Sequence, residues 1–326
     1  MRISLMIEPQ QGLSYDEQLE IARLAQSSGY ETLYRSDHYT SFPGAAGRPT
    51  TDAWTVLAGL ARETETIRLG VLVSPVTFRH PGSFAKVVTT VDEMSGGRID
   101  VGVGAGWNEV EHRALGLAFP PIETRADLME DELALLHGLW TEPDGWSYEG
   151  HQIRVDAALF RPRPVQRPRP PIIIGGTGSP RSLRLAARYA DEYNMSSTNP
   201  DECREAYGRL DAECRRIGRD PATLARSVMA GVLIGSNAAE LEKRALAQMA
   251  MVADDASVTR ASAAASDAKA WLEARRSRWI MGTPDEARAM VARFADAGAE
   301  KVMLQDLLPR DLEMIELAAA ELIGRI

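Results

Sequence analysis

The chain has little of what would place a protein outside a reducing, aqueous compartment. Its 326 residues include only two cysteines, Cys203 and Cys214. On a helix they would lie roughly 16 Å apart, too far for a disulfide bond, and free thiols are typical of the cytoplasm. There is no run of about 18 apolar residues, and the apolar N-terminal stretch breaks at Glu8 and Pro9. We therefore expect a cytoplasmic protein without a membrane span or signal peptide.

Basic charge and metal-binding motifs are also scarce. The net charge is -9, which argues against a nucleic-acid-binding surface. A group of arginines is interleaved with prolines and is interpreted as an extended loop, at Arg161, Arg163, Arg167 and Arg169. The five histidines are scattered, and no Cys-x-x-Cys or His-Glu-x-x-His motif occurs, so we expect no metal site.

The chain does contain a regular alternation of short apolar runs and amphipathic segments. The expected strands span residues 2–7, 32–36, 67–73, 99–103, 171–176, 192–196, 228–234 and 301–305. Helical periodicity fills the intervals between them, as over 15–28 with Ser14 as N-cap, or after Thr283 and Pro284. Eight successive strand–helix units favour a closed (β/α)8 TIM barrel over an open doubly wound sheet.

Two segments interrupt this rhythm, at approximately 105–169 after the fourth strand and 238–280 after the seventh. The second is rich in alanine and charged residues and is expected to be helical over 238–275. Insertions after barrel strands usually contribute to the functional face. No linker rich in proline, serine or glycine separates two units, so residues 1–326 are expected to form a single domain.

The C-terminal ends of barrel strands share one face, where barrel enzymes hold their active sites. The second strand delivers Asp37 and His38 to that face, and Glu8 and Gln305 end the first and last strands. A capped turn with a surface histidine is the alternative for the Asp37–His38 pair. His112, in the segment Glu109-Val110-Glu111-His112, is instead expected on the surface of a helix.

Two glycine-rich stretches are candidate binding loops. Gly175-Gly176-Thr177-Gly178 runs from a strand into a helix, so its backbone N–H groups and the helix N-terminus form a candidate phosphate site. Arg181 adds a positive charge there. The run Gly102-x-Gly104-x-Gly106 lacks the following helix of a dinucleotide fingerprint. It is better suited to close approach of a planar ligand, with contacts from Trp107 and Asn108.

With these motifs in order, the chain resembles the bacterial luciferase-like superfamily of flavin and deazaflavin oxidoreductases over essentially its whole length. Within it, Ser-Asp-His after the second strand is most similar to the branch that uses coenzyme F420. The resemblance rests on residues 36–38, 74–81, 92–98, 102–109, 171–176 and 282–287. It implies a homodimer that transfers hydride between F420 and a small organic substrate.

The resemblance also implies roles for individual residues. His38, with Asp37, would lie beside the reactive ring and transfer a proton. Phe42 occupies a position where relatives often have a tryptophan near the substrate, and Trp107 would close the apolar mouth with it. The coenzyme contacts implied are Val71 and Leu72, where relatives have a non-prolyl cis peptide, then Ser74, Ala105, Gly106, Asn108, Gly175, Gly176, Thr177 and Gly178.

Three alternatives remain open at this point. An FMN-dependent two-component monooxygenase shares the fold and most motifs. A protein that binds a flavin or deazaflavin without turnover would also fit, although the intact Asp37–His38 pair speaks against it. A phosphate-handling aldolase or isomerase would need a base at a strand end, for which Glu8 qualifies, whereas Lys301 begins its strand and so lies at the opposite face.

Overall fold

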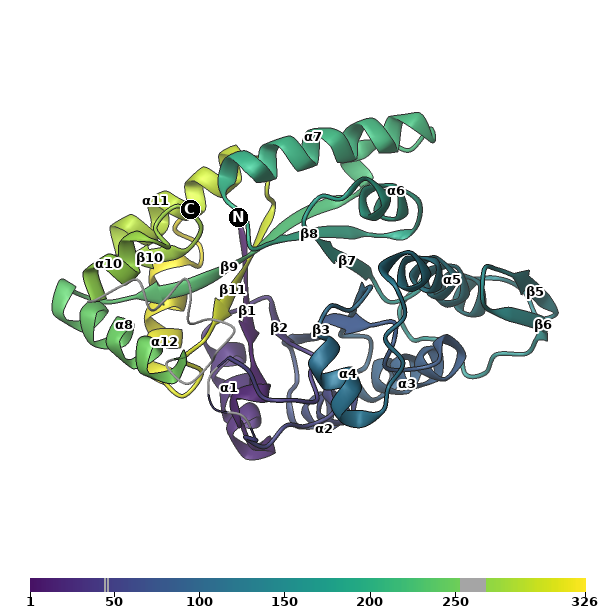
Figure 1. The fold of residues 1–326 in the computed structure, drawn as a ribbon, viewed down its shortest axis with the longest axis horizontal. Coiled ribbons are helices and arrows are strands. Elements are labelled where there is room, and N and C mark those ends of the chain that lie inside the picture. The colour runs from purple at the N-terminus through teal and green to yellow at the C-terminus, as the bar shows by residue number, and fades with distance from the viewer. Residues whose placement is uncertain (44, 46, 253–267) are drawn as a thin grey trace.

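A closed barrel of eight parallel strands forms the centre of the molecule (Figure 1). The computed structural model describes residues 1–326 except 44, 46 and 253–267. The barrel strands are β1 (Arg2–Ile7), β2 (Thr32–Arg35), β3 (Arg68–Pro75), β4 (Ile99–Gly104), β7 (Ile172–Gly176), β8 (Glu192–Ser196), β9 (Ala225–Ile234) and β11 (Lys301–Asp306). Each strand pairs in parallel with the next one along the barrel, and β11 pairs with both β9 and β1, which closes the ring. The predicted TIM barrel is therefore confirmed.

Helices surround the barrel, and the local signals in the sequence set where they begin. They are α1 (Tyr15–Ser27), α2 (Ala53–Glu63), α3 (Pro81–Ser95), α5 (Ile122–Thr141), α6 (Pro180–Tyr189), α7 (Pro200–Arg216), α11 (Pro284–Asp296) and α12 (Leu312–Leu322). The Ser14 hydroxyl accepts a hydrogen bond from the Glu17 backbone N–H, and Thr283 forms the same kind of capping box with Glu286. Among the described residues, no helix has the length and apolarity needed to cross a membrane.

The first insertion holds α4 (Glu109–Leu115), the barrel helix α5 and an antiparallel hairpin of β5 (Trp146–Glu149) and β6 (Arg154–Ala158). The hairpin extends beyond α5 at one end of the molecule (Figure 1). The sequence analysis missed it because its strands are half exposed and carry no apolar run. The buried carboxylate of Asp131 on α5 accepts the backbone N–H groups of residues 151, 152 and 153 in the hairpin turn.

The second insertion was expected to be one helical stretch over 238–275. It contains α8 (Ala238–Val252) and α10 (Ala268–Glu273), and the residues between them lie outside the described part of the chain. A short strand that the sequence analysis did not predict, β10 (Ile280–Gly282), follows and extends the sheet along the C-terminal end of β9. Two single 3-10 turns, η1 (Pro9–Gln11) and η2 (Pro221–Thr223), complete the regular elements described.

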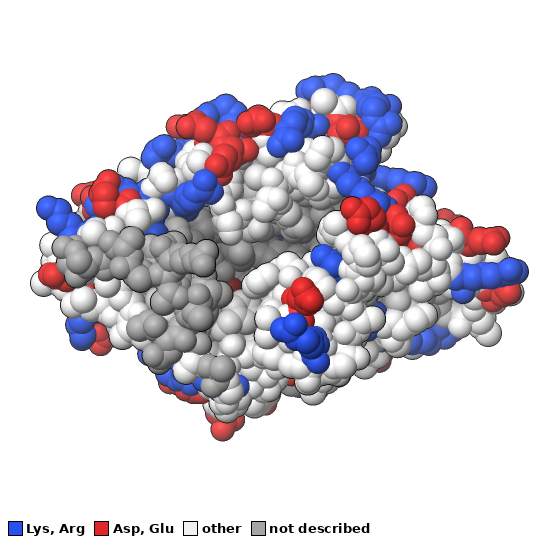
Figure 2. Space-filling view, in the orientation of Figure 1, with Lys and Arg blue, Asp and Glu red and all other residues white. Residues whose placement is uncertain are grey.

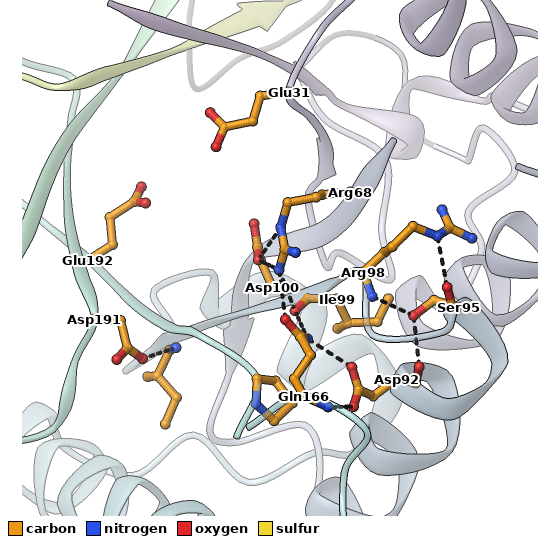
Figure 3. Close-up of polar contacts among 12 residues, drawn as sticks. Glu31, Arg68, Asp92, Ser95, Arg98, Ile99, Asp100, Gln166, Asp191 and Glu192 are labelled. Carbon is orange, nitrogen blue, oxygen red and sulfur yellow. Dashed lines mark hydrogen bonds and ion pairs between the residues drawn. The ribbon is translucent and has the colours of Figure 1, made fainter. Parts of the chain in front are cut away.

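The N-terminal end of the barrel interior is filled by a buried charged network. The Lys301 ammonium lies 2.6 Å from the Glu192 carboxylate and donates a hydrogen bond to the Tyr34 hydroxyl. That hydroxyl donates in turn to Asp100, which also pairs with Arg68 (Figure 3). Buried charges need such partners, so this end of the barrel is occupied by its own side chains. Lys301 lies away from the C-terminal face, as its place in the sequence predicted.

Arg98, just after α3, joins three elements by hydrogen bonds to backbone carbonyls. Gly96 and Gly97 both have positive φ angles, 69° and 89°, which end the helix and lead the chain back towards β4. The guanidinium of Arg98 then donates to the carbonyls of Ala61 (2.8 Å), Thr64 (2.9 Å), Ile67 (2.6 Å) and Ser95 (2.8 Å). Figure 3 shows Arg98 beside Ser95 at this junction.

Replacing Arg98 by alanine should destabilise the protein by about 2–4 kcal/mol, because several carbonyls lose a charged donor at once. Denaturant unfolding followed by circular dichroism measures the change. Arg154→Ala, at an exposed side chain in the β5–β6 hairpin, is the matched control and should leave the free energy of unfolding nearly unchanged. Equal effects of the two substitutions would contradict this role for Arg98.

Candidate active site

A cavity of about 600 Å³ opens at the C-terminal ends of the barrel strands. Figure 2 shows a hollow near the middle of the molecule, beside α4. Its wall includes residues from every side of the barrel: Glu8, His38, Val73, Ala105, Gly175, Asn194, Met229 and Gln305. The side chains that the sequence analysis placed on one face therefore surround a common space.

His38 lies at one end of this cavity, largely buried, with its ring held on two sides. Its Nδ1 atom is 2.9 Å from Oε1 of Glu111, and the other oxygen of that carboxylate accepts the Tyr39 backbone N–H at 3.0 Å. Because a carboxylate only accepts, the proton of a neutral imidazole resides on Nδ1 and Nε2 is left as the acceptor. Phe42 and Trp107 contact the ring edge-to-face, with centroids 4.4 and 5.8 Å away.

Glu111 is the functional residue that sequence reasoning missed. It comes from α4, in the first insertion, and is only 1% exposed. The Asn108 side chain caps α4 by accepting from the Val110 backbone N–H, so the sequence contained a signal for the start of this helix. The sequence did not indicate which carboxylate of α4 turns inward, because that depends on how α4 packs over the barrel.

Asp37 is placed behind His38, and its side chain is not among the residues that line the cavity. It is 1% exposed and receives both terminal nitrogens of Arg79, at 2.6 and 3.2 Å. The Ser74 hydroxyl donates to the same carboxylate at 3.0 Å and accepts from the indole of Trp54 at 2.8 Å. Asp37 and Ser74 thus form the support of the site, and Arg79 reaches Asp37 from the loop after β3.

The end of β3, which carries Ser74, also forms part of the cavity wall. A cis peptide joins Leu72 and Val73, one residue later than the expected Val71–Leu72 position, and Leu72 and Val73 line the cavity. Val71 is fully buried and does not line it. A Cβ atom on Gly104 would lie 2.5 Å from Val73, and one on Gly175 2.9 Å from it. Glycine at both positions therefore lets Val73 lie against the neighbouring strand ends.

The loop after β4 divides between the cavity and the protein interior. Ala105, Gly106 and Trp107 line the cavity, whereas Asn108 serves as the cap of α4. His112 was expected at a helix surface, and this is wrong. It is 0% exposed, with Nε2 2.6 Å from the Thr77 hydroxyl and Nδ1 2.7 Å from the Asn108 carbonyl. It fastens α4, and hence Glu111, to the loop after β3.

The glycine loop after β7 lies at the far end of the cavity. Gly175, Gly176 and Thr177 line it with Ser179, the N-cap of α6. The N–H of Gly178 donates to the Tyr193 hydroxyl at 3.0 Å, so this residue contributes to the loop itself and not to the cavity wall. The remaining loop atoms and the N-terminus of a ten-residue helix suit an anionic group.

The cation at this loop differs from the expected one. Arg181 is directed away to the carboxylates of Asp127 and Glu130. Arg209, on α7, lies beside the loop: its Nη2 atom is 3.0 Å from where a Cβ on Gly178 would be, and its carboxylate partner Glu205 is 3.9 Å distant. No local signal marks Arg209, because α7 comes next to the loop only through its packing against α6.

The residues present fit a planar ring with a phosphate-bearing tail. The cavity is lined by Leu72, Val73 and Gly104–Gly106, by the His38 imidazole and by the glycine loop before α6. Among the described residues, no cluster of three or more His, Cys, Asp or Glu could hold a metal ion.

Comparison with known proteins agrees with this geometry. A family model for luciferase-like monooxygenases matches residues 1–301. The chain belongs to this family. Over 322 residues it is 29% identical to the F420-dependent glucose-6-phosphate dehydrogenase of Microbacterium testaceum, with 95% of this chain and 93% of the relative covered. Over 241 residues it is 28% identical to the FMNH2-dependent dimethylsulfone monooxygenase of Pseudomonas putida, with 70% and 65% covered.

The luciferase-like fold is equally clear from solved structures. An F420-dependent secondary alcohol dehydrogenase, in complex with an F420–acetone adduct, superimposes with a TM-score of 0.81 over 98% of both chains, at 19% identity. At that identity the likeness shows the fold alone. The family assignment thus rests on the family model, and the two sequence relatives above are named for F420 and for reduced FMN.

One turn of α5 beyond the cavity-lining Met129 lies a buried acid, Glu132. Burial raises the pKa of Glu132 to about 8, against the opposing effect of the Arg79 charge. The carboxyl is thus neutral at neutral pH in the folded protein and charged in the unfolded one. The contribution of the neutral Glu132 carboxyl to folding stability is fully present below the ordinary pKa of a glutamate. It is lost as the pH rises towards the folded-state pKa.

Glu132→Gln should remove this pH dependence. The free energy of unfolding of the variant relative to the wild type should rise between pH 4.5 and about 8 and level off above, by up to about 1.4 kcal/mol per pH unit. Urea unfolding at a series of pH values measures it, with Glu123→Gln, at an exposed position of the same helix, as control. A variant that parallels the wild type at every pH would rule out a buried neutral Glu132.

Proposed function

We propose that this luciferase-like protein is an oxidoreductase that transfers hydride between coenzyme F420 and a small organic substrate. The single observation that carries the proposal is the His38–Glu111 pair beside a cavity that is also lined by the glycine loop before α6. The near-full-length similarity to a relative named as F420-dependent supports the choice of coenzyme.

The chain's own residues would hold this coenzyme along the cavity. The deazaflavin ring would rest on Leu72, Val73, Ala105 and Gly106, and the phosphate on the loop of Gly175, Gly176 and Thr177, with Ser179 and Arg209 beside it. Gly178 would act by shaping that loop. When bound, F420 supplies the hydride chemistry at C5 of its ring.

His38 would move the proton that accompanies hydride transfer. With Nδ1 bonded to Glu111, its Nε2 atom takes the hydroxyl proton of an alcohol as it becomes a carbonyl, and returns it in the reverse direction. The Glu111 carboxylate holds the ring in this tautomer and stabilises the imidazolium. Phe42 and Trp107 would exclude water around the substrate. Asp37 positions the end of β2 through Arg79 and does not itself touch the reacting atoms.

His38→Asn should lower turnover by about 10²–10⁴-fold, because the general acid–base group is lost. Binding of F420, followed by its fluorescence, should be unchanged. Glu111→Gln should lower turnover less and move the pH–rate profile. His151→Asn, at an exposed histidine, is the control. Full turnover in His38→Asn would refute the role assigned to His38. If the wild-type protein bound F420 but turned over nothing in a broad substrate panel, it would be a non-catalytic binding protein.

The competing candidate is an FMN-dependent two-component monooxygenase, and the similarity to the Pseudomonas putida enzyme favours it. Titration of the purified protein with F420 and, separately, with reduced FMN distinguishes the two. If the protein bound reduced FMN but not F420, and then consumed oxygen, the monooxygenase would replace the F420-dependent function proposed above.

We also propose that residues 1–326 form a single domain that assembles as a homodimer in the cytoplasm. This rests on the resemblance to the F420-using branch and on the two buried free cysteines. Light scattering on a sizing column measures the assembly, and limited proteolysis tests the single domain.

A further inference from the structure

The cavity lining combines carboxylates with apolar side chains. Glu8 and Glu111 belong to it, and Glu111, Phe42 and Trp107 contact His38. Among the described residues that line the cavity, none is a lysine or an arginine. A site built to bind a substrate phosphate or carboxylate would be expected to present such a cation.

The arginines described around the cavity are bound to other groups. Arg35 is 2% exposed and donates to Gln18 and Thr51. Arg79 is bound to the carboxylates of Asp37 and Asp52. Arg278 donates to the carbonyl of the cavity-lining Ser197 and pairs with Glu202. None of the three lines the cavity.

Within the described part of the chain, the Glu8 carboxylate is bound by two neutral amides and forms no ion pair, while the Arg35 charge acts on it from a longer distance. Glu8 is 6% exposed, and its two oxygens accept hydrogen bonds from the amides of Gln10 at 2.7 Å and Gln305 at 2.5 Å. Gln10 is oriented in turn by the Ser36 hydroxyl, which donates to its carbonyl at 2.6 Å. Neutral amides fix the carboxylate but do not neutralise its charge. A second negative charge nearby is strongly disfavoured in such a partly desolvated site.

We propose, resting on the function proposed above, that the substrate is an uncharged alcohol or carbonyl compound with an apolar flank, and that Glu8 excludes phosphorylated and carboxylated compounds. In the oxidation, the C–H bond of the carbinol carbon breaks and its hydride passes to the deazaflavin. The O–H proton passes to Nε2 of His38, and the C=O double bond forms. The specificity thus differs from that in the name of the Microbacterium testaceum relative.

Binding of matched ligands to the F420-loaded protein tests this without relying on turnover. The probes are cyclohexanone, 4-oxocyclohexanecarboxylate and glucose 6-phosphate, measured by saturation-transfer NMR and by competition. Cyclohexanone should bind at least about tenfold more tightly than the carboxylate, and glucose 6-phosphate should not compete. Equal or tighter binding of either anion would overturn the proposal.

Glu8→Gln tests the residue itself. It removes the charge while keeping the shape, so the preference for cyclohexanone over the carboxylate should fall severalfold, with F420 affinity unchanged. Glu149→Gln, at an exposed position of the hairpin, should leave the preference intact. An unchanged preference in Glu8→Gln would remove Glu8 as the determinant, and the wild-type comparison stands even where the variant folds poorly.

The two proposals fail in different ways. A protein that does not bind F420 defeats the proposed function, and the ligand comparison is then not reached. A protein that binds F420 and accepts anions as readily as ketones keeps the proposed function and loses only the substrate class.

Discussion

The buried ion pair between Asp37 and Arg79 is the contact on which the candidate site depends. It joins the end of β2 to the loop after β3, and Arg79 continues to Asp52 at the N-cap of α2. Removing one partner of such a pair leaves an uncompensated buried charge, which is far more costly than the pair itself is stabilising. The next residue along the chain is His38, so the position of the imidazole follows from this pair.

A second constraint comes from the first insertion. Glu111 reaches His38 from α4, 73 residues further along the chain, and His112 on the same helix is tied to Thr77. The imidazole is therefore clamped between the barrel and the insertion. The insertion that covers the mouth of the barrel also supplies the carboxylate of Glu111, which sets the tautomer of His38. The same helix therefore covers the site and orients its histidine.

The two ends of the barrel differ in how they treat charge. At the N-terminal end, Lys301, Glu192, Asp100 and Arg68 neutralise one another within the interior. At the C-terminal end, Glu8 and Glu111 face a cavity that no described lysine or arginine lines. The first arrangement is stabilised by its own partners, whereas the second leaves polar atoms available to a ligand. This contrast is what connects the electrostatics of the fold to the class of substrate we infer.

Periodicity and end signals in the sequence were enough for the eight-stranded barrel, the capped starts of α1 and α11, and the delivery of His38 and the Gly175 loop to one face. These features depend on neighbours close along the chain. The roles of Glu111, Gly178, Arg209 and His112 were decided only by the tertiary structure, as was the Leu72–Val73 cis peptide. So was the β5–β6 hairpin, whose turn is bound by Asp131 of the preceding helix α5. In the contacts among these cases the partner belongs to another element of the fold, and hydrophobic periodicity carries no information about which side chain faces which.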